Sequence, residues 1–313
     1  MRFAFILDPL DHIKAYKDSS VAMMREAQRR GHEVWAIMRA ALAWRGGAVH
    51  AAVARLTARD DDHDWFTAQA PLDLPLAGFD AVLMRQDPPF DMEYVAATWL
   101  LERAQASGVR VFNHPRAVRD TSEKLAILEF PQLIPETRVA REPELLQAFI
   151  EAEGDVILKP LDGMGGSQIF RVRRDDPNRN VIVETLSGYG TRTIMAQRFL
   201  PAIAQGDKRI LLIGGEVVPF ALARIPKPGE TRGNLAVGGS GVAQPLGASD
   251  RAIAEHLAPI LHARGILLAG IDVIGDRLTE INVTSPTCFV EITQQTGFSV
   301  AGMFLDALER ACA

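Results

Sequence analysis

The first third of the chain alternates short apolar segments with segments of helical periodicity. The apolar segments, which we expect to form strands, are residues 3–7, 34–38, 81–84 and 109–112. Two segments, residues 19–30 and 94–106, show the helical pattern, and each is closely followed by a glycine that would end a helix. Strands that alternate with helices predict a mostly parallel sheet covered on both faces. Residues 40–75 are weakly patterned and acidic, and we expect them to form a solvated connection.

From about residue 121 the pattern changes to strands joined by glycine-containing turns. The expected strands are residues 157–160, 169–172, 194–200, 209–213, 216–219, 269–274 and 278–283. The pair Gly214-Gly215 predicts a hairpin between two of them. Helices are expected at residues 250–264 and 299–311. We therefore place a first domain at residues 1–120 and a second at residues 121–313.

Composition excludes several classes of protein. A chain of 313 residues can form two or three packed lobes, and a net charge of -5 argues against a general nucleic-acid binder. No apolar stretch reaches the roughly 20 residues that a membrane helix needs. The only cysteines are Cys288 and Cys312, which provide neither a disulfide framework nor metal-binding spacing. We expect a cytoplasmic protein with no nucleic-acid or membrane partner.

A glycine-rich segment, residues 162–167, lies between two expected strands. Its backbone N–H groups are little obstructed by side chains, which suits close approach to phosphate oxygens. It has neither the lysine of a Walker loop nor the following helix of a dinucleotide fingerprint. A plain hairpin turn would look similar, but Lys159 on the incoming strand can place an ammonium group near the same phosphates. Lysine is rare in this chain, with only six against 28 arginines.

Asp272, Glu280 and Asn282 are polar residues inside two apolar strands near the C-terminus. Glu280 and Asn282 are two residues apart, so their side chains share one face of a strand, and a hairpin would bring Asp272 beside them. Carboxylate and amide oxygens suit Mg²⁺ bound together with substrate phosphates, and no histidine or cysteine nearby suggests zinc. The alternative is an exposed polar face, although unpaired carboxylates among apolar residues would be costly.

A long glycine-rich segment, residues 225–241, is too flexible for a core element. Such a loop is usually functional or disordered. If it closes over a site, Arg232 and Asn234 are the polar groups that it could bring to an anionic transition state. Arg85 follows an expected strand at its C-terminal end, where parallel sheets bind ligands. Arg209 and Arg224 flank the expected hairpin, although most arginines are simply solvated.

Taken together, these residues resemble the bacterial type of glutathione synthetase, an ATP-grasp enzyme. The matching segments are residues 84–91, 158–166, 223–226, 229–236 and 279–287. The likeness covers nearly the whole chain and is weakest at residues 40–75, at Lys227-Pro228 and beyond Glu291. The resemblance implies an α/β chain of α+β lobes, with an ATP-grasp fold behind an N-terminal parallel-sheet (pre-ATP-grasp) domain. Within the second domain it implies a nucleotide-binding lid lobe at residues 121–200 and a catalytic lobe at residues 201–313.

The resemblance also implies a reaction. Enzymes of this kind phosphorylate the terminal carboxylate of γ-glutamylcysteine with ATP, and the amine of glycine then attacks the acyl phosphate to give glutathione, ADP and phosphate. The implied metals are two Mg²⁺ ions, with Mn²⁺ as an alternative. The implied partners are these small molecules and further copies of the chain in a homotetramer.

Site residues carry over one by one onto the matching positions. The nucleotide would be held by Lys124, Lys159, Gly163, Met164, Gly165, Gly166, Gln197, Phe199, Leu200 and Asp207. The metal ligands would be Asp272, Glu280 and Asn282. The catalytic groups would be Arg209, Arg232 and Asn234, and the dipeptide would contact Arg85, Arg224, Asn282 and Ser285.

Other readings remain open. Another ATP-grasp ligase, making D-alanyl dipeptides or adding glutamate to a protein tail, would share the phosphate loop and the metal ligands. A non-catalytic ATP-binding module like the synapsins would share the fold but would be expected to lose metal ligands or the loop arginine. Here Asp272, Glu280, Asn282 and Arg232 are all present.

Overall fold

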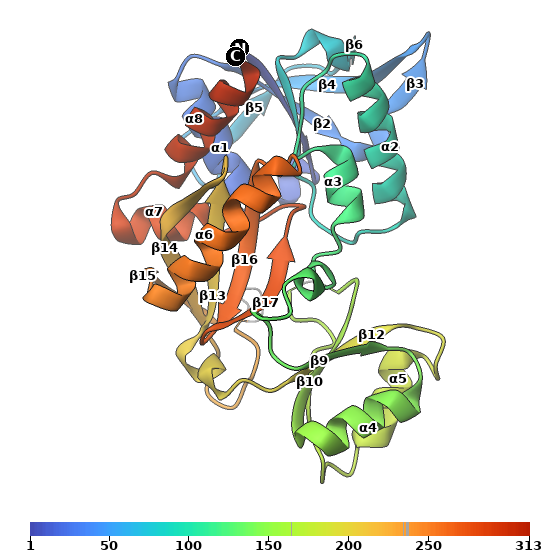
Figure 1. The fold of residues 1–313 in the computed structure, drawn as a ribbon. Helices are drawn as coiled ribbons and strands as arrows, with labels where there is room; N and C mark the ends of the chain where they lie inside the picture. The colour runs from blue at the N-terminus through green and yellow to red at the C-terminus, as the bar shows by residue number, and fades with distance from the viewer. Residues whose placement is uncertain (164, 234, 236–237) are drawn as a thin grey trace.

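The chain folds around three β-sheets, as the computed structural model in Figure 1 shows. The structure describes residues 1–163, 165–233, 235 and 238–313. The first sheet is built from residues 2–112, the second from residues 137–198 and the third from residues 207–282. Within the described ranges, no helix is long and apolar enough to cross a membrane.

The first sheet combines a parallel half with an antiparallel half. Its strands are β1 (Arg2–Leu7), β2 (Glu33–Met38), β3 (Ala43–Arg45), β4 (Ala48–Ala58), β5 (Phe66–Ala68), β6 (Leu72–Pro75), β7 (Ala81–Met84) and β8 (Val111–Phe112). Strands β2, β1, β7 and β8 are parallel neighbours, whereas β3, β5 and β6 all pair antiparallel with β4, which pairs antiparallel with β2. The expectation of a parallel sheet therefore holds for the half that carries β1 and β7.

The prediction of a solvated connection at residues 40–75 was wrong. This stretch forms β3 to β6 and extends the sheet, and the 11-residue β4 buries alternate side chains such as Val49, Ala51 and Val53. Alternation of this kind is typical of a half-buried strand. The alternation is difficult to recognise in the sequence because alanine occupies positions on both faces of β4 and reduces the contrast between apolar and polar residues.

Helices cover both faces of the first sheet. They are α1 (Ser19–Arg29), α2 (Met92–Ala106) and α3 (Pro115–Asp120), with short 3₁₀ helices η1 (Leu10–His12), η2 (Arg39–Ala41) and η3 (Leu76–Gly78). Phe3 and Phe5 of β1 belong to the core that contains α1, whereas the intervening Ala4 belongs to the core of α2. Helix α1 begins at Asp18, whose carboxylate accepts a hydrogen bond from the N–H of Val21 at 2.9 Å.

The second sheet forms a separate lobe, at the bottom of Figure 1. Its antiparallel strands are, in spatial order, β11 (Phe170–Arg173), β10 (Asp155–Pro160), β12 (Ile194–Arg198) and β9 (Thr137–Ala140). Helices α4 (Pro143–Glu153) and α5 (Arg179–Ser187), which the sequence pattern did not reveal, share its small core. The face of the second sheet opposite these helices is directed toward the third sheet.

The third sheet is antiparallel throughout. In spatial order it contains β15 (Ser240–Pro245), β14 (Glu216–Ile225), β13 (Asp207–Ile213), β16 (Leu268–Ile274) and β17 (Arg277–Asn282). Two 3₁₀ helices, η4 (Ala126–Glu129) and η5 (Pro201–Gln205), lie beside it, and α6 (Ala248–Ala263) packs on one face. Helices α7 (Phe289–Thr296) and α8 (Val300–Cys312) pack on the other face.

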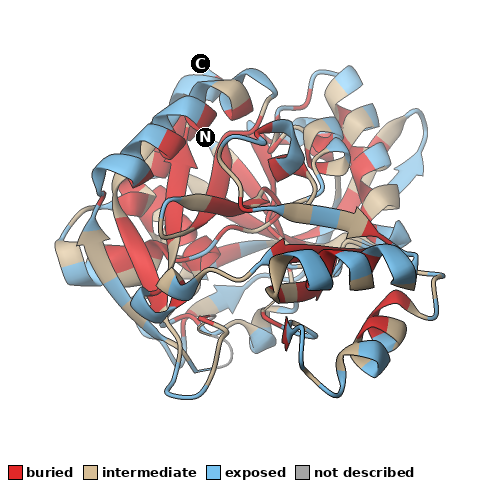
Figure 2. Cartoon of the chain, turned by 60° about the horizontal axis from the view of Figure 1, so that its bottom comes forward, coloured by how far each residue is buried: buried red, intermediate tan, exposed pale blue. Residues whose placement is uncertain are grey.

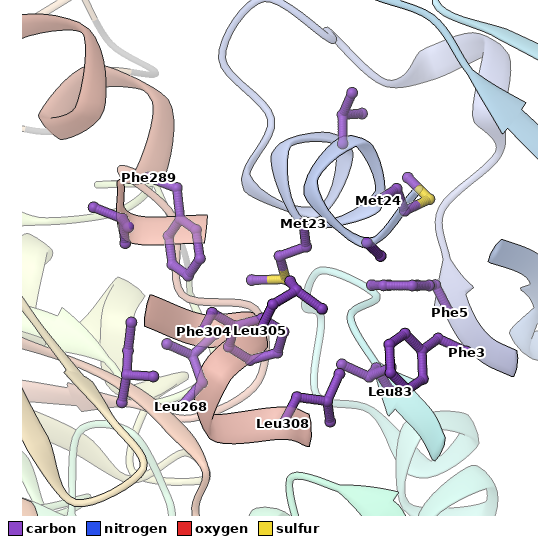
Figure 3. Packing of buried hydrophobic residues seen from close by; sticks show 14 of the residues in the cluster. Phe3, Phe5, Met23, Met24, Leu83, Leu268, Phe289, Phe304, Leu305 and Leu308 are labelled. Atoms are coloured by element: carbon purple, nitrogen blue, oxygen red, sulfur yellow. The ribbon is translucent and has the colours of Figure 1, made fainter. Parts of the chain in front are cut away.

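Helices α7 and α8 join the first and third sheets into one body. Figure 3 shows Phe304, Leu305 and Leu308 of α8 among Met23 of α1 and Leu268 of β16. The chain termini therefore lie close together (Figure 1), and the strands between the helices are mostly buried (Figure 2). The relative placement of the two sheets is set by a continuous apolar core.

Asn113, just after β8, adds a polar link between the same two sheets. Its side-chain Nδ2 donates to the carbonyls of Leu268 at 2.7 Å and Val283 at 2.8 Å, and its Oδ1 accepts from the N–H of Leu268 at 2.9 Å. Asn113 is only 7% exposed, so water cannot replace these bonds.

We predict that Asn113→Ala lowers the free energy of unfolding by about 3 kcal/mol, because each buried backbone group left without a partner costs about 1–3 kcal/mol. Urea denaturation followed by far-UV circular dichroism measures the change. Asn180→Ala, at an exposed position of α5, is the control and should leave the midpoint almost unchanged. Equal midpoints for the two variants would contradict a structural role for Asn113.

Candidate active site

A cavity lies between the second and third sheets. Twelve of the residues selected from the sequence line it: Lys124, Lys159, Gly163, Gly165, Gly166, Gln197, Phe199, Leu200, Asp207, Arg232, Asp272 and Glu280. Two further predicted residues, Met164 and Asn234, lie outside the described residues. The remaining predicted residues do not line it: Arg209, Arg224 and Asn282 lie on the third sheet, and Arg85 and Ser285 follow β7 and β17.

Two buried lysines face the cavity in different surroundings. The Nζ of Lys124 donates to the carbonyl of Gly163 at 2.6 Å and lies 2.9 Å from Oε1 of Glu280. The Nζ of Lys159 donates only to the carbonyl of Thr279, at 3.2 Å, among the described residues, and no described carboxylate lies within ion-pair distance of it. Burial lowers the pKa of Lys159, with only partial compensation from Glu280. Among the described residues, Lys159 is thus a buried cation without an anionic partner.

The glycine-rich segment forms the connection between the antiparallel strands β10 and β11, as expected. Gly165 and Gly166 have φ angles of 63° and 81°, which glycine adopts without steric strain. A Cβ at Gly163 would lie 3.0 Å from Cγ of Pro160. Gly163, Gly165 and Gly166 all line the cavity, so the backbone of this loop borders it directly, as an anion-binding loop requires.

An apolar wall closes the other end of the cavity. Phe199 and Leu200 follow directly after β12, which ends at Arg198 and not at Leu200 as the sequence had suggested. The guanidinium of Arg171 lies 3.6 Å from the centroid of the Phe199 ring, and Asp155 holds Arg171 through two hydrogen bonds of 2.9 and 2.5 Å. A fixed aromatic ring beside aliphatic side chains suits a flat, apolar ligand group such as a base.

Two arginines and two aspartates form a buried ion group beneath the cavity. Arg209 binds Asp272 through Nε at 2.5 Å and Nη2 at 3.0 Å. The Nη2 of Arg224 lies 2.9 Å from Oδ2 of Asp272 and 2.6 Å from Oδ2 of Asp207. The strand register explains these pairs, because Arg209 lies opposite Asp272 and Asp207 lies opposite Arg224 on neighbouring strands.

The two aspartates of this group differ in their electrostatic environment. Burial acts to raise the pKa of Asp272, but the attraction of Arg209 and Arg224 outweighs it and holds that pKa well below the ordinary range. Burial raises the pKa of Asp207 to about 6 against the attraction of Arg224. Within the described part of the chain, Oδ1 of Asp207 has no hydrogen-bond partner. The oxygen is buried, although Asp207 lines the cavity, so a ligand hydroxyl that reached it would meet an acceptor without a described partner.

The three predicted metal ligands share one face of the third sheet. Asp272 lies opposite Glu280, and Nδ2 of Asn282 is 3.3 Å from Oδ2 of Asp272. Oδ2 of Asp272 is contacted by both arginines and Asn282, and Oδ1 accepts from Nε of Arg209, which leaves Asp272 little capacity for a metal. Glu280 has only Lys124 as an ion-pair partner among the described residues. The donor set therefore fits Mg²⁺ best at Glu280 and the amide oxygen of Asn282, with phosphate oxygens completing the shell.

The second glycine-rich segment lies over the same cavity. It runs between β14 and β15, so Ile225, Ser240 and Gly241 belong to strands and the connection itself is residues 226–239. Arg232 donates to the carbonyl of Gly166 at 3.3 Å and to Oε2 of Glu230 at 2.6 Å. The hydrogen bond from Arg232 lowers the pKa of Glu230 to about 2. The two loops thus touch each other at the cavity mouth.

Arg85 and Ser285 lie on the side of the first domain. Arg85 follows β7 and is buried, with Nε donating to Oγ of Ser20 at 3.1 Å and Nη2 donating to the carbonyl of Pro286 at 2.9 Å. Ser285 donates to Oδ1 of Asp87 at 2.5 Å. These contacts place the segment after β17 between the ion group and the C-terminal end of the parallel strands.

Sequence reasoning missed Glu123. Its Oε1 accepts hydrogen bonds from the N–H of Val283 at 2.9 Å and from the N–H and hydroxyl of Thr284 at 3.0 and 2.8 Å. Burial, followed by repulsion from Glu280, raises the pKa of Glu123. These hydrogen bonds hold residues 283–284 against Glu123, which directly precedes Lys124 in the chain. Nothing in its local sequence distinguishes it from a surface glutamate.

Comparisons with known proteins agree with this arrangement. Two family models match the chain, "Prokaryotic glutathione synthetase, N-terminal domain" over residues 1–119 and "Prokaryotic glutathione synthetase, ATP-grasp domain" over residues 123–297. The glutathione synthetase of Ralstonia nicotianae is 59% identical over 311 residues, covering 99% of this chain and 96% of the relative. That of Nitrosomonas europaea is 58% identical over 313 residues, covering 99% and 98%.

A solved structure shares the fold at low identity. The ATP-grasp ligase PsnB, complexed with a phosphomimetic variant of a minimal precursor, Mg and ADP, superimposes with a TM-score of 0.63 at 18% identity, covering 99% of this chain and 98% of that one. Both family models together span nearly all of the chain, and relatives match it at more than half of their positions. The chain belongs to the prokaryotic glutathione synthetase family of ATP-grasp ligases.

Proposed function

We propose that this ligase joins γ-L-glutamyl-L-cysteine to glycine through an acyl phosphate, with conversion of ATP to ADP and phosphate. The observation that carries the phosphate chemistry is Lys159, a buried ammonium group that faces the cavity and lacks an anionic partner in the described structure. A buried charge of this kind is costly unless a ligand neutralises it. The neighbouring glycine-rich loop and Lys124 supply the other groups that a triphosphate needs. The family relationship supports the choice of dipeptide and glycine.

ATP would lie with its base against Phe199 and Leu200 and its ribose near the unpartnered Oδ1 of Asp207. Its phosphates would then reach Lys124 and Lys159 beneath the glycine loop. In this placement the base contacts the apolar side chains, and the phosphates contact the two lysines. It leaves the ion group of Arg209 and Arg224 beside the γ-phosphate.

In the first step, a carboxylate oxygen of the cysteinyl residue attacks the γ-phosphorus of ATP, and the bond from phosphorus to the ADP oxygen breaks. A carboxylate and a triphosphate repel each other, so cations must neutralise both. Lys124 and Lys159 act on the nucleotide, whereas Arg209 and Arg224 act on the carboxylate and on the acyl phosphate. Mg²⁺, in two ions with Mn²⁺ as an alternative, would bind Glu280 and Asn282 beside Asp272 and supply further charge neutralisation on the phosphate oxygens.

In the second step, the neutral amine of glycine attacks the carbonyl carbon, the bond from carbon to the phosphate oxygen breaks, and the nitrogen gives up one proton, which the leaving phosphate can take. The developing oxyanion and the leaving phosphate both need cationic partners that water would weaken. Arg232 lies on the loop that already touches Gly166 across the cavity mouth. We assign it to this intermediate, together with Asn234 on the same loop, and we assign closure of residues 226–239 to the exclusion of water.

We also propose that the enzyme works in the cytoplasm. Cys288 and Cys312 are both free thiols, which suits the cytoplasm and leaves the substrate as the source of the reactive thiol. Assembly of the chain into a homotetramer stays a prediction from the resemblance.

We predict that ADP release requires γ-glutamylcysteine together with ATP and Mg²⁺, and that sustained turnover also requires glycine. A coupled assay of ADP release with and without glycine measures this. Turnover with D-alanine in place of the dipeptide, or no turnover with any dipeptide, would contradict the proposed substrates.

We predict that Arg232→Ala lowers kcat for ligation by about 100-fold or more, the usual cost of removing a group that stabilises an anionic intermediate. ATP affinity, measured by isothermal titration calorimetry, should change little because Arg232 contacts the phosphate loop only through one long hydrogen bond, to the carbonyl of Gly166 at 3.3 Å. Arg251→Ala, at an exposed position of α6, is the matched control. Weakened ATP binding as the only effect would refute this role.

We predict that Lys159→Met raises the melting temperature of the ligand-free enzyme and abolishes its stabilisation by ATP. The folded protein lowers the pKa of Lys159, so the charged form opposes folding below that pKa and the penalty fades as pH rises through it. ATP at 100 times its Kd should stabilise the wild type by about 2.7 kcal/mol.

Differential scanning fluorimetry at several pH values tests this trade-off, with Lys14→Met at an exposed lysine as the control. The gain in melting temperature should be largest near neutral pH and should shrink in alkaline solution. A variant that loses stability but still responds to ATP would show that Lys159 has a structural role instead.

A further inference from the structure

Asp155 and Arg171 form an ion pair on the second sheet, at the end away from the glycine-rich loop. Asp155 begins β10, two residues before Ile157 and four before Lys159, both of which line the cavity. Alternate residues of a strand share one face, so Asp155 lies on the cavity face, about 13 Å along the strand from Lys159. Arg171 lies opposite Ile157 on β11 and shares that face. The pair is therefore at the base end of the cavity and not at the phosphate end.

This ion pair holds Phe199 in two ways. The carbonyl of Asp155 accepts a hydrogen bond from the N–H of Phe199 at 2.9 Å. Its carboxylate accepts from Nε of Arg171 at 2.9 Å and from Nη2 at 2.5 Å, a two-point contact that fixes the plane of the guanidinium. That guanidinium lies over the ring of Phe199, with Cζ 3.6 Å from the ring centroid. Asp155 thus fixes both the backbone of Phe199 and the cation that covers its ring.

The pair contacts the ring and does not line the cavity. Phe199 and Leu200 are among the lining residues, whereas Asp155 and Arg171 are not. The side chains of Arg171 and Asp155 are 28% and 33% exposed, and an ion pair at such positions contributes little to stability. Because the two charges neutralise each other, the pair acts on the position of the ring and adds little charge at the ligand.

We propose that Arg171 and Asp155 are positioning residues for the nucleotide base, and that they act by holding the ring of Phe199 in the orientation that the base contacts. This inference rests on the proposed function, which places the base against Phe199 and Leu200. A ring that is already ordered loses no further freedom when the base binds, so more of the contact energy appears as affinity. The gain should be larger for a purine than for a pyrimidine, because a purine has the larger flat surface.

The test compares ATP with UTP, which has the same ribose and triphosphate and differs only in the base. Isothermal titration calorimetry with Mg²⁺ and no other substrate measures both Kd values. We expect Arg171→Ala to raise the Kd for ATP about 10-fold and the Kd for UTP at most about 3-fold. The KM for ATP should rise in parallel. In contrast, kcat and the KM values for γ-glutamylcysteine and glycine should stay near those of the wild type, because the reacting groups are untouched.

Arg173→Ala is the matched control. Arg173 lies on the same strand, two residues from Arg171, and its Nε is 4.0 Å from Oδ2 of Asp155. Among the described residues it lies over no aromatic ring. This variant should keep the wild-type Kd for both nucleotides. Asp155→Asn keeps the backbone contact and one acceptor for Arg171, so it should fold and raise the Kd for ATP by an intermediate factor.

A double-mutant cycle tests whether Arg171 acts through Phe199. In a Phe199→Leu background, Arg171→Ala should change the Kd for ATP by no more than about 2-fold. An equal loss of ATP affinity with and without the ring would show that Arg171 contacts the nucleotide directly, and would overturn the inference.

The inference would also be overturned by an unchanged Kd for ATP in Arg171→Ala, or by equal losses for ATP and UTP, which would place the effect on the phosphates or on the whole lobe. A wild-type enzyme that binds ATP but does not ligate γ-glutamylcysteine to glycine would instead refute the proposed substrates and leave the role of Arg171 standing. The two failures are therefore distinguishable.

Discussion

The contact between Asp272 and two arginines is the interaction on which the site depends. Removing charges from water costs several kcal/mol each, and only close pairing offsets this. Arg209 and Arg224 come from different strands, and both reach Asp272 because they lie in matching register. A shift of one residue would turn either side chain to the opposite face of the sheet. The ion group therefore holds β13, β14 and β16 in one register and fixes two guanidinium groups at the cavity floor.

Local sequence patterns predicted part of the site, whereas Lys124, Gln197, Phe199, Leu200 and Asp207 were expected only from the family resemblance. Glu280 and Asn282 share a face by strand periodicity, and Lys159 lies on the strand that leads into the phosphate loop. Local turn chemistry likewise identified the hairpin at Gly214-Gly215. The α/β first domain and the strand-rich second part followed from the same periodicities, and the family match bears out the ATP-grasp fold.

What could not be predicted depends on contacts between distant segments. Glu123 and Thr284 are 161 residues apart, and their hydrogen bond exists only because η4 lies beside β17. Asp272 was expected as a metal ligand, and its pairing with arginines from two neighbouring strands could not be predicted because it depends on sheet order. The extension of the first sheet by β4 could not be predicted for a local reason, because the alanines of β4 give little contrast in polarity between the two faces of the strand.

The charged side chains at the centre of the site are paired, whereas each end of the site carries a buried cation without a described anionic partner. At the centre the arginines and Asp272 neutralise each other, which keeps their positions fixed before any ligand arrives. At the ends, Lys159 and Arg85 are buried without anions in the described structure, so the fold carries their desolvation cost in the ligand-free state. A ligand that brings an anion to either end recovers that cost, and part of its affinity comes from this recovery. Substrates that lack one of the two anions would lose more affinity than a single hydrogen bond provides, because they would leave a buried charge uncompensated. Selectivity for a ligand with two anions would follow from this placement of two cations that have no anionic partner among the described residues.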